Sequence, residues 1–395
     1  MHEEEIKKLF HRQEHYVLGT YSPTDLVLTR GALTRVWDIH DNQYLDFTSG
    51  ISVCNLGHCH PRVTEAIQRQ AATLVHVSNL FMNNNQPELA ARIAQNSFDG
   101  KVFFCNSGAE ANEGLIKFAR RWGNENGRHQ IITMENSFHG RTLATLAATG
   151  RAKYRKGFQP DTPGFLHVPF NSIDAARAAV NDTTAAILLE PVQGEGGVIP
   201  AHSDYLTALR QLCDENGILL LFDEVQCGMG RTGTLFAYQK YGVIPDGMAM
   251  AKALANGFPI GAFEVKSEYA DILPPGTHAS TFGGNPLACA AGVAVFDTFE
   301  KEDILDNCNR MAAYLWDELS NLAQRHDTVL DIRGMGLMIG IELASPVKPL
   351  VQRARENGLL VLSAGENVLR LLPPLVIEAN DVDRAVSIID KCLDA

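Results

Sequence analysis

Short runs of apolar residues alternate with longer amphipathic stretches through most of the chain. The apolar runs have the length of buried strands and read KVFFC, QIITM, FLHVPF, AAILLEP, ILLLFDE, DGMAMA and GAFEV. The stretches between them include helical patterns at residues 109–122, 203–216 and 285–300. Continuous apolar strands separated by helices indicate a mostly parallel sheet that helices cover on both faces. The pattern therefore predicts an α/β fold.

Both ends of the chain depart from this alternation. Near the N-terminus, RVWDIHDNQYLDF alternates around a turn at Asp41 and Asn42, which is typical of a β-hairpin. Towards the C-terminus, helical patterns precede TVLDIRGMGLMIGIEL and GLLVLSAGENVLRLLPPL, which indicate a smaller α+β domain. We therefore expect an N-terminal segment, residues 1–45, that packs with the small domain, then a large domain, residues 46–290, and the small domain, residues 291–395.

Composition and charge narrow the class of protein. The 395 residues are 45% hydrophobic and 20% charged, which is typical of globular chains, and the net charge of −12 argues against a basic nucleic-acid-binding surface. No apolar run approaches the about 18 residues of a membrane helix. The N-terminal MHEEEIKKLF is too acidic for a transit peptide and lacks the apolar region of a signal peptide. Eight scattered cysteines favour reduced thiols, so we expect a cytoplasmic protein.

One stretch, CNLGHCHP at residues 54–61, gathers two cysteines and two histidines that could bind a metal. Glycine and proline at Gly57 and Pro61 favour a turn instead. We therefore expect no metal site.

Polar residues follow several of the predicted strands, and ligands of open α/β sheets collect at the carboxyl ends of strands. The apolar run ILLLF leads directly into Asp223, although an aspartate is almost never buried without a partner. An isolated buried carboxylate would cost several kcal/mol, so a cation must meet Asp223 or the strand end is hydrated. The strand-end groups together are Asn106, Ser107, Glu190, Asp223, Glu224 and Lys252.

The glycines at residues 228–233 fit the pattern G-x-G-x-x-G. A nicotinamide site needs the first glycine directly after the strand and a helix that opens through the last. Here DEVQC intervenes, and TGTLFAY does not open like a helix. Flexible glycines beside a pocket are the better interpretation.

After KVFFC, the sequence Ser107-Gly108-Ala109-Glu110 opens a helix with the spacing of a capping box. In one interpretation, Ser107 and Glu110 cap the helix and nothing binds there. In the other, the free N–H groups and the hydroxyl hold a phosphate at the helix start. This stretch alone leaves both open.

Three further stretches contain candidate ligand-binding residues. In MENSFHGRT, Phe138 is either a core residue or the cover of a flat ligand, and Arg141 is either a surface cation or a carboxylate clamp. Glu195 lies in the flexible loop EPVQGEGG, and Arg370 interrupts an apolar run where it needs a carboxylate from the protein or a substrate. Lys252, in GMAMAKALANG, either reaches solvent or forms a Schiff base.

Taken together, these stretches resemble the class III, fold-type I aminotransferases, which use pyridoxal 5′-phosphate. The resemblance runs from about Tyr21 to PPL at residues 373–375. NSGAEAN, SFHGRT, EPVQGEGG, FDEVQCGMGRTG, AKAL and STFGGNPLACA occur in family order and spacing. The LGHCHP, FDEVQCGMGRTG and IRGMGLMIG stretches look most like acetylornithine aminotransferases.

The resemblance implies a pyridoxal-phosphate-binding large domain and a homodimer with shared active sites. It implies that Asp223 keeps the pyridine nitrogen protonated, and that Lys252 binds the cofactor aldehyde and later acts as a base. The other cofactor contacts that it implies are Ser107, Gly108 and Ala109 at the phosphate, Phe138 over the ring, Gln226 at the ring hydroxyl, and Thr281 at the phosphate of the neighbouring subunit.

The same resemblance implies the substrates. Arg141 would bind the carboxylate far from the reacting amine, and Arg370 would accept the α-carboxylate of glutamate. Glu195 would neutralise Arg370 when the other substrate is bound, and Tyr21 is a further substrate-binding candidate. The implied reaction moves the δ-amino group of N2-acetylornithine to 2-oxoglutarate in arginine biosynthesis, giving N-acetylglutamate 5-semialdehyde and glutamate.

Several alternatives stay open at this point. Related enzymes use succinylornithine, succinyl-diaminopimelate, ornithine or 4-aminobutyrate as the amine. Met82 stands where enzymes that take free ornithine usually carry tyrosine, which favours an acylated amine. Alternatives of other classes are a nicotinamide-dependent dehydrogenase, which needs the fingerprint rejected above, and a non-catalytic scaffold, which should have lost Asp223 or Lys252.

Overall fold

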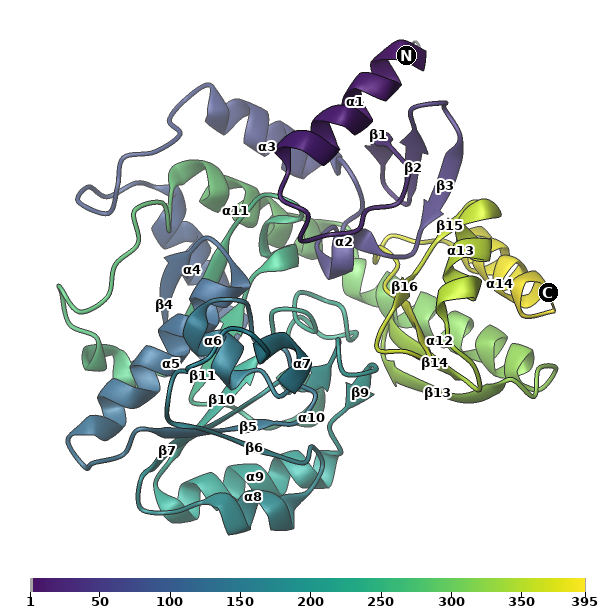
Figure 1. The fold of residues 1–395 in the computed structure, drawn as a ribbon. Coiled ribbons are helices and arrows are strands. Elements are labelled where there is room, and N and C mark those ends of the chain that lie inside the picture. The colour runs from purple at the N-terminus through teal and green to yellow at the C-terminus, as the bar shows by residue number, and fades with distance from the viewer. Residues whose placement is uncertain (1–2, 395) are drawn as a thin grey trace.

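The computed structural model describes residues 3–394, so residues 1, 2 and 395, at the ends of the first and last predicted parts, lie outside the described residues. Figure 1 shows a central sheet with helices around it, and beside it a smaller group of strands and helices formed by the C-terminal part of the chain.

The central sheet has seven strands in the order β4-β12-β11-β10-β7-β5-β6. Strands β5, β6, β7, β10 and β11 pair in parallel, which confirms the predicted mostly parallel sheet. Strand β12 pairs antiparallel with both β11 and β4. The strands are β4 (Lys101–Cys105), β5 (Gln130–Met134), β6 (Phe165–Val168), β7 (Thr184–Leu189), β10 (Leu219–Asp223), β11 (Gly247–Met250) and β12 (Gly261–Val265).

Strand β10 shows why the central strands read as continuous apolar runs. Leu219 and Leu221 belong to the core cluster on the side of helix α5 (Gly108–Asn124). Leu220 and Phe222 belong to the cluster on the side of helix α9 (Ser203–Asn216). Both faces are buried, and each such side chain contributes about 1.5–3 kcal/mol. Helices α5, α9 and α11 (Pro286–Lys301) correspond to the three predicted helical patterns.

The predicted N-terminal hairpin is confirmed and joins the C-terminal part of the chain. Strands β2 (Arg35–Asp38) and β3 (Gln43–Asp46) pair antiparallel, and Asp41 takes a positive φ of 62° in their turn. Strand β3 then pairs in parallel with β15 (Leu359–Leu360). A second sheet, β13-β14-β17-β16, is antiparallel throughout. Its strands are β13 (Val329–Met335), β14 (Met338–Leu343), β16 (Leu362–Ser363) and β17 (Val368–Leu371).

The remaining elements are mostly helices; strand β1 pairs with β2, and β8 pairs with β9. These elements are α1 (Glu3–Tyr16), β1 (Leu28–Ala32), α2 (Ser49–Ser52), α3 (Pro61–Ala71), α4 (Asn85–Gln95), α6 (Leu143–Ala148), α7 (Ala152–Arg155), α8 (Ile173–Ala179), β8 (Val192–Gln193), β9 (Ile199–Pro200), α10 (Ala237–Tyr241), η1 (Lys252–Ala255), η2 (Ser267–Ile272), α12 (Ile304–Ala323), α13 (Lys348–Glu356) and α14 (Ala379–Leu393). The predicted boundary at residue 290 stays a prediction.

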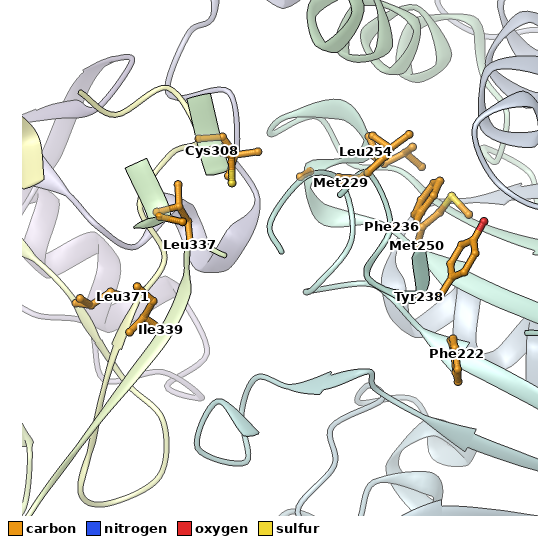
Figure 2. Close-up of a cluster of buried hydrophobic side chains, with 14 of the residues drawn as sticks. Phe222, Met229, Phe236, Tyr238, Met250, Leu254, Cys308, Leu337, Ile339 and Leu371 are labelled. Carbon is orange, nitrogen blue, oxygen red and sulfur yellow. The ribbon is translucent and has the colours of Figure 1, made fainter. Parts of the chain in front are cut away.

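One apolar core runs from the central sheet into the C-terminal part. Figure 2 shows Phe222, Phe236 and Met250 on one side and Leu337, Ile339 and Leu371 on the other, and all belong to the same buried cluster. The two parts therefore share buried surface.

A fully buried arginine crosses the same junction. Arg231 donates from Nε to Ser52 Oγ (3.0 Å) and from Nη2 to Asn55 Oδ1 (2.5 Å). Its Nη1 donates to the carbonyl oxygens of Leu337 (3.1 Å) and Pro373 (2.5 Å). Burial lowers the pKa of Arg231 to about 10. Neutral oxygens of three separate segments therefore hold one cation.

The stretch at residues 54–61 forms a turn, with positive φ at Gly57 (82°) and Cys59 (51°). Its histidines pair with carboxylates: His58 with Asp46 at 2.7 Å and His60 with Glu302 at 3.2 Å. Within residues 3–394, no group of three or more His, Cys, Asp or Glu side chains is arranged to hold a metal ion. No helix of the same residues is long and apolar enough to span a membrane.

The carboxylates of Asp223 and Glu224, at the end of strand β10, have different hydrogen-bond partners. Asp223 interacts with helix α5 and the cavity described below, whereas Glu224 caps helix α10. The Glu224 oxygens accept from the backbone N–H groups of Ala237 (2.6 Å) and Tyr238 (2.7 Å). Burial raises the pKa of Glu224 to about 7, although these two N–H groups oppose the shift.

This raised pKa predicts how stability depends on pH. The folded protein binds the Glu224 proton more tightly than the unfolded chain, so stability falls as pH rises from about 4.5 to about 7. Glu224→Gln removes the titration while keeping one acceptor oxygen. We expect the Tm of the wild type, relative to that of Glu224→Gln, to fall between about pH 5 and pH 8.

The matched control is Glu125→Gln, which changes an exposed carboxylate at the end of α5. Its Tm should follow the wild type across the pH range. Parallel curves for the wild type and Glu224→Gln would contradict the assignment.

Candidate active site

A cavity of about 450 Å³ opens at the carboxyl ends of the central strands. Segments that follow β4, β5, β7, β10 and β11 line it, as the strand-end rule predicts. Of the twelve predicted site residues, eight line this cavity: Ser107, Gly108, Ala109, Phe138, Arg141, Asp223, Gln226 and Lys252.

Asp223 is buried and has both oxygens hydrogen bonded. Its Oδ2 accepts from Asn112 Nδ2 (2.7 Å) and lies 2.8 Å from His139 Nδ1, and its Oδ1 accepts from Val225 N (3.0 Å). Burial by itself lowers the pKa of His139, but the hydrogen bond to Asp223 and the charges of Asp223 and Glu190 outweigh it, so the net pKa is raised. His139 is therefore one of the partners that the buried carboxylate at the strand end requires.

Neither partner of Asp223 was among the predicted site residues. His139 stands inside the quoted SFHGRT stretch, where its position after a strand was the available signal. Asn112 ends the quoted NSGAEAN stretch and lies within helix α5 on a face that is otherwise buried, and these were the available signals. Asn112 Oδ1 and His139 Nε2 are both buried without a hydrogen-bond partner among the described residues.

Glu190 joins two parts of the cavity wall. It follows strand β7, and its oxygens accept from Phe138 N (2.9 Å) and Gly194 N (3.4 Å). Burial raises the pKa of Glu190 to about 7, while the charge of His139 opposes the shift and that of Asp223 adds to it. The carboxyl group therefore changes charge near neutral pH and links Phe138 to the loop that carries Glu195.

Lys252 lines the cavity, so it is not a lysine that simply reaches solvent. It follows β11 with a positive φ of 47°, a conformation that non-glycine residues rarely adopt and that occurs most often at functional sites. Burial lowers the pKa of Lys252, and the charge of Arg370 adds to this effect, while Glu195 and Asp223 oppose it. A lowered pKa makes the neutral, nucleophilic amine more accessible.

The start of helix α5 both caps the helix and faces the cavity. Glu110 N donates to Ser107 Oγ (3.2 Å), and Glu110 Oε2 accepts from Asn106 N (2.7 Å). At Gly108, an added Cβ would lie 2.7 Å from a methyl carbon of Val225, so only glycine fits beside this side chain. The two interpretations of this stretch are compatible.

Arg370 forms the carboxylate pair that its apolar surroundings require. From strand β17, its Nη1 donates to Glu195 Oε1 (2.6 Å) and Gln226 Oε1 (3.1 Å). Burial raises the pKa of Glu195, but the charge and the hydrogen bond of Arg370, together with smaller effects of Lys252 and Gln226, outweigh it, so the net pKa is lowered. At Gly194, an added Cβ would lie 2.0 Å from Gln226 Oε1, so glycine is needed for this arrangement.

Three predicted residues lie at the rim or outside. The exposed guanidinium of Arg141 stacks on Tyr154, 4.1 Å from the ring centroid, and lies 5.6 Å from the Phe138 ring. Tyr21 is 86% exposed, and Thr281 is exposed as well. Neither Tyr21 nor Thr281 lines the cavity of the single chain, so their roles stay predictions.

The glycines at residues 228–233 form turns, and the next helix, α10, begins only at Ala237. This arrangement lacks the strand–turn–helix context of a nicotinamide fingerprint.

Comparison with known proteins identifies the family. Residues 17–393 match the family model described as aminotransferase class-III. An acetylornithine aminotransferase from Caldanaerobacter subterraneus subsp. tengcongensis is 50% identical over 385 residues, which are 96% of this chain and 98% of that protein. Another, from Methanocaldococcus jannaschii, is 48% identical over 96% of both chains. The chain belongs to the class-III aminotransferases.

Solved structures agree with this assignment. An ornithine aminotransferase from Toxoplasma gondii, described with partial occupancy of pyridoxal phosphate at its active site, has a TM-score of 0.94 and 35% identity, and covers 98% of this chain and 94% of its own. An acetylornithine aminotransferase from Elizabethkingia anophelis has a TM-score of 0.87 and 33% identity, with 98% of both chains covered. The class-III aminotransferase described here uses pyridoxal 5′-phosphate.

The groups in the cavity of this class-III aminotransferase fit that cofactor. The Lys252 amine suits an aldehyde, the Asp223 carboxylate suits a protonated ring nitrogen, and the start of helix α5 suits a phosphate. All three line one cavity of a size typical of small-molecule sites.

The charge of Glu190 yields a prediction. When ionised, Glu190 raises the pKa of Lys252, so Glu190→Gln should lower the pH at which Lys252 loses its proton. In apoenzyme, the rate at which the Lys252 amine captures added pyridoxal phosphate, followed by visible absorbance, reports the neutral amine. We expect the midpoint of its pH dependence to move to lower pH in Glu190→Gln.

Glu135→Gln is the control, because Glu135 is exposed and does not line the cavity. It should leave the midpoint unchanged. A midpoint in Glu190→Gln that equals the wild-type value, or lies above it, would refute the coupling.

Proposed function

We propose that this aminotransferase moves the δ-amino group of N2-acetylornithine to 2-oxoglutarate, giving N-acetylglutamate 5-semialdehyde and glutamate. The observation that carries this proposal is the closed Glu195–Arg370 pair near Lys252, with Arg141 separate at the rim. In such a site Arg370 is already neutralised by Glu195, and Arg141 is the cation left to bind a carboxylate. This arrangement suits a substrate whose carboxylate is remote from its reacting amine. The names and identities of the two relatives support the same substrate.

Each cavity residue would have a different role toward the cofactor. When bound, pyridoxal phosphate supplies an electron sink for the electrons left when a proton leaves the substrate. Asp223, oriented by Asn112 and His139, would keep the ring nitrogen protonated through a charge-assisted hydrogen bond of about 1.5–3 kcal/mol. Lys252 would hold the cofactor through its aldehyde, and once freed by the substrate amine it would act as the base that takes and returns the substrate proton.

The remaining cofactor contacts fix position. The N–H groups at the start of α5 and the Ser107 hydroxyl bind the phosphate. Phe138 covers one face of the ring, held through its backbone by Glu190. The Gln226 oxygen accepts from Arg370, so its amide N–H would be the group that donates to the ring hydroxyl. The phosphate-binding residues are Ser107, Gly108 and Ala109.

Arg370 and Glu195 let one pocket accept two amino donors. With acetylornithine, Glu195 neutralises Arg370, so the amine end meets no excess charge. With glutamate, Glu195 moves away and Arg370 binds the α-carboxylate. Arg141 binds the remote carboxylate of either substrate.

A homodimer with shared active sites completes the proposal, with Thr281 at the phosphate of the neighbouring subunit and Tyr21 at a substrate. The adjacent side chains of Leu80 (87% exposed), Phe81 (69%) and Met82 (92%) support a partner surface, because such apolar patches on a single chain mark interaction sites. All eight cysteines are free, which suits the reducing cytoplasm. We place the proposed role in arginine biosynthesis in that compartment.

The function is tested by mixing holoenzyme with single amines and following the visible absorbance of the cofactor. We expect N2-acetylornithine to convert the cofactor faster than ornithine or 4-aminobutyrate. Borohydride should fix the cofactor to the wild-type chain but not to Lys252→Ala, because Lys252 is the amine that lines the cavity. Lys348→Ala, which changes an exposed lysine, is the control. Faster conversion of the cofactor by ornithine than by N2-acetylornithine would overturn the proposed substrate assignment.

Removal of the Glu195 carboxylate tests the two-donor pocket. In Glu195→Gln, the buried Arg370 loses its charged partner beside the amine end of acetylornithine. We expect the acetylornithine half-reaction to slow by about tenfold and the glutamate half-reaction to slow much less, since glutamate brings its own carboxylate. Single-turnover kinetics with each donor measure both, and equal losses would count against the switch.

A further inference from the structure

The loop between β11 and β12 carries Lys252 and has left-handed backbone at both ends of its short helix η1. Lys252, the first residue of η1, has a φ of 47°, and Asn256, just after its last residue, has a φ of 46°. Residues other than glycine rarely adopt this conformation, although asparagine does so more readily than most. The unfavourable backbone of Lys252 persists because surrounding contacts hold it.

The side chain of Asn256 supplies two such contacts. It is buried, its Oδ1 accepts from Leu56 N (2.8 Å), and its Nδ2 donates to the carbonyl oxygen of Gly57 (3.0 Å). Leu56 and Gly57 belong to the turn at residues 54–61, far from Asn256 along the chain. One amide therefore binds the end of η1 to two successive backbone groups of that turn.

The turn itself is held by other segments. Leu33 and His58 exchange two backbone hydrogen bonds, each of 2.8 Å, and Gly57 N donates to the carbonyl oxygen of Cys54 (2.9 Å). At Gly57, an added Cβ would lie 2.7 Å from Leu33 Cα, so the two backbones pack directly against each other. The turn is therefore a fixed base for the loop that carries Lys252.

Both of the segments that Asn256 joins contribute to the active-site cavity. Val53, directly before the turn, lines the cavity, and so do Lys252 and residues 257–260 of the loop. Asn256 itself does not line the cavity. It therefore acts on the site only through the positions of the segments that it joins.

We propose that Asn256 is a positioning residue for Lys252. Its two hydrogen bonds hold the end of η1 against the fixed turn, and this keeps the amine at the start of η1 within reach of the cofactor aldehyde. The inference rests on the proposed role of Lys252, but not on the identity of the amino donor.

The consequence concerns one bond. The neutral Lys252 amine adds to the aldehyde carbon and water leaves, so a carbon–nitrogen double bond replaces the carbon–oxygen double bond. This equilibrium within the bound complex depends on how well the amine is placed. Binding of the ring and the phosphate depends on other residues, Asp223 and the start of helix α5.

The test compares two forms of the cofactor on apoenzyme. Pyridoxal phosphate can bond to Lys252, whereas pyridoxamine phosphate has the same ring and phosphate but no aldehyde. Asn256→Gly removes the amide, and glycine adopts a φ of 46° freely. We expect the Kd of pyridoxal phosphate to rise about tenfold, because the amine is no longer held in place, and the Kd of pyridoxamine phosphate to change little. Fluorescence titration measures both.

Asn171→Gly is the matched control. Asn171 also has a positive φ (61°), accepts from His202 N (2.9 Å) and donates to the carbonyl oxygen of Pro200 (3.1 Å). It does not line the cavity. Both glycine variants should lower the Tm, but only Asn256→Gly should weaken the binding of pyridoxal phosphate relative to that of pyridoxamine phosphate.

A second variant, Asn256→Asp, adds a dependence on pH. A neutral carboxyl group can accept from Leu56 N and donate to the Gly57 carbonyl oxygen, as the amide does, whereas a carboxylate has no proton to donate. Burial raises the pKa of a carboxyl group. We expect the loss of pyridoxal phosphate affinity, relative to the wild type at the same pH, to be larger at about pH 8 than at about pH 6.

The outcomes separate positioning from general loosening of the fold. Equal weakening of both cofactor forms in Asn256→Gly would refute the positioning role, and so would unchanged binding of pyridoxal phosphate. If Asn256→Gly does not fold, Asn256→Asp decides, and a loss of affinity that is the same at both pH values refutes the proposal. Failure of N2-acetylornithine to react would overturn the proposed function and leave these binding measurements unaffected.

Discussion

The burial of Asp223 is the constraint around which the site is arranged. A carboxylate at the end of a fully apolar parallel strand requires donors from other elements, and helix α5 and the segment after β5 supply them through Asn112 and His139. Those donors fix where the neighbouring side chains can lie. Phe138 precedes His139, and the backbone of Phe138 is bound in turn by Glu190. One buried charge thereby sets the positions of both walls of the cavity.

Much of this could be predicted from sequence, because fully buried strands read as apolar runs and their polar ends meet at one edge of a parallel sheet. Asp223, Lys252 and the start of helix α5 were found in that way. The reversed direction of β12 could not be read, because an apolar run looks alike in both directions. Asn112 was missed although it ends the NSGAEAN stretch, because the sequence does not show that its side chain reaches Asp223, 111 residues away. The part played by Glu224 was missed because its partners lie more than ten residues away.

The site also includes a residue from the antiparallel C-terminal sheet. The rule that ligands bind at the carboxyl ends of parallel strands does not apply to this sheet. Arg370 stands on the antiparallel β17, and its apolar neighbours indicated only that it needed a carboxylate. The structure identifies Glu195 as that partner and adds Gln226. Resemblance placed Tyr21 and Thr281 at the site, and the single chain leaves both exposed, so their roles stay predictions.

The buried guanidinium of Arg231 limits how this enzyme can open. Its four hydrogen bonds join α2, the β13–β14 turn and the chain after β17, and no counter-ion stays with it if those segments separate. A hinge motion that moved the C-terminal sheet away would break the hydrogen bonds to Leu337 and Pro373, at about 1.5–3 kcal/mol for each bond from a charged donor. These bonds therefore favour a fixed position of the C-terminal sheet relative to the central sheet.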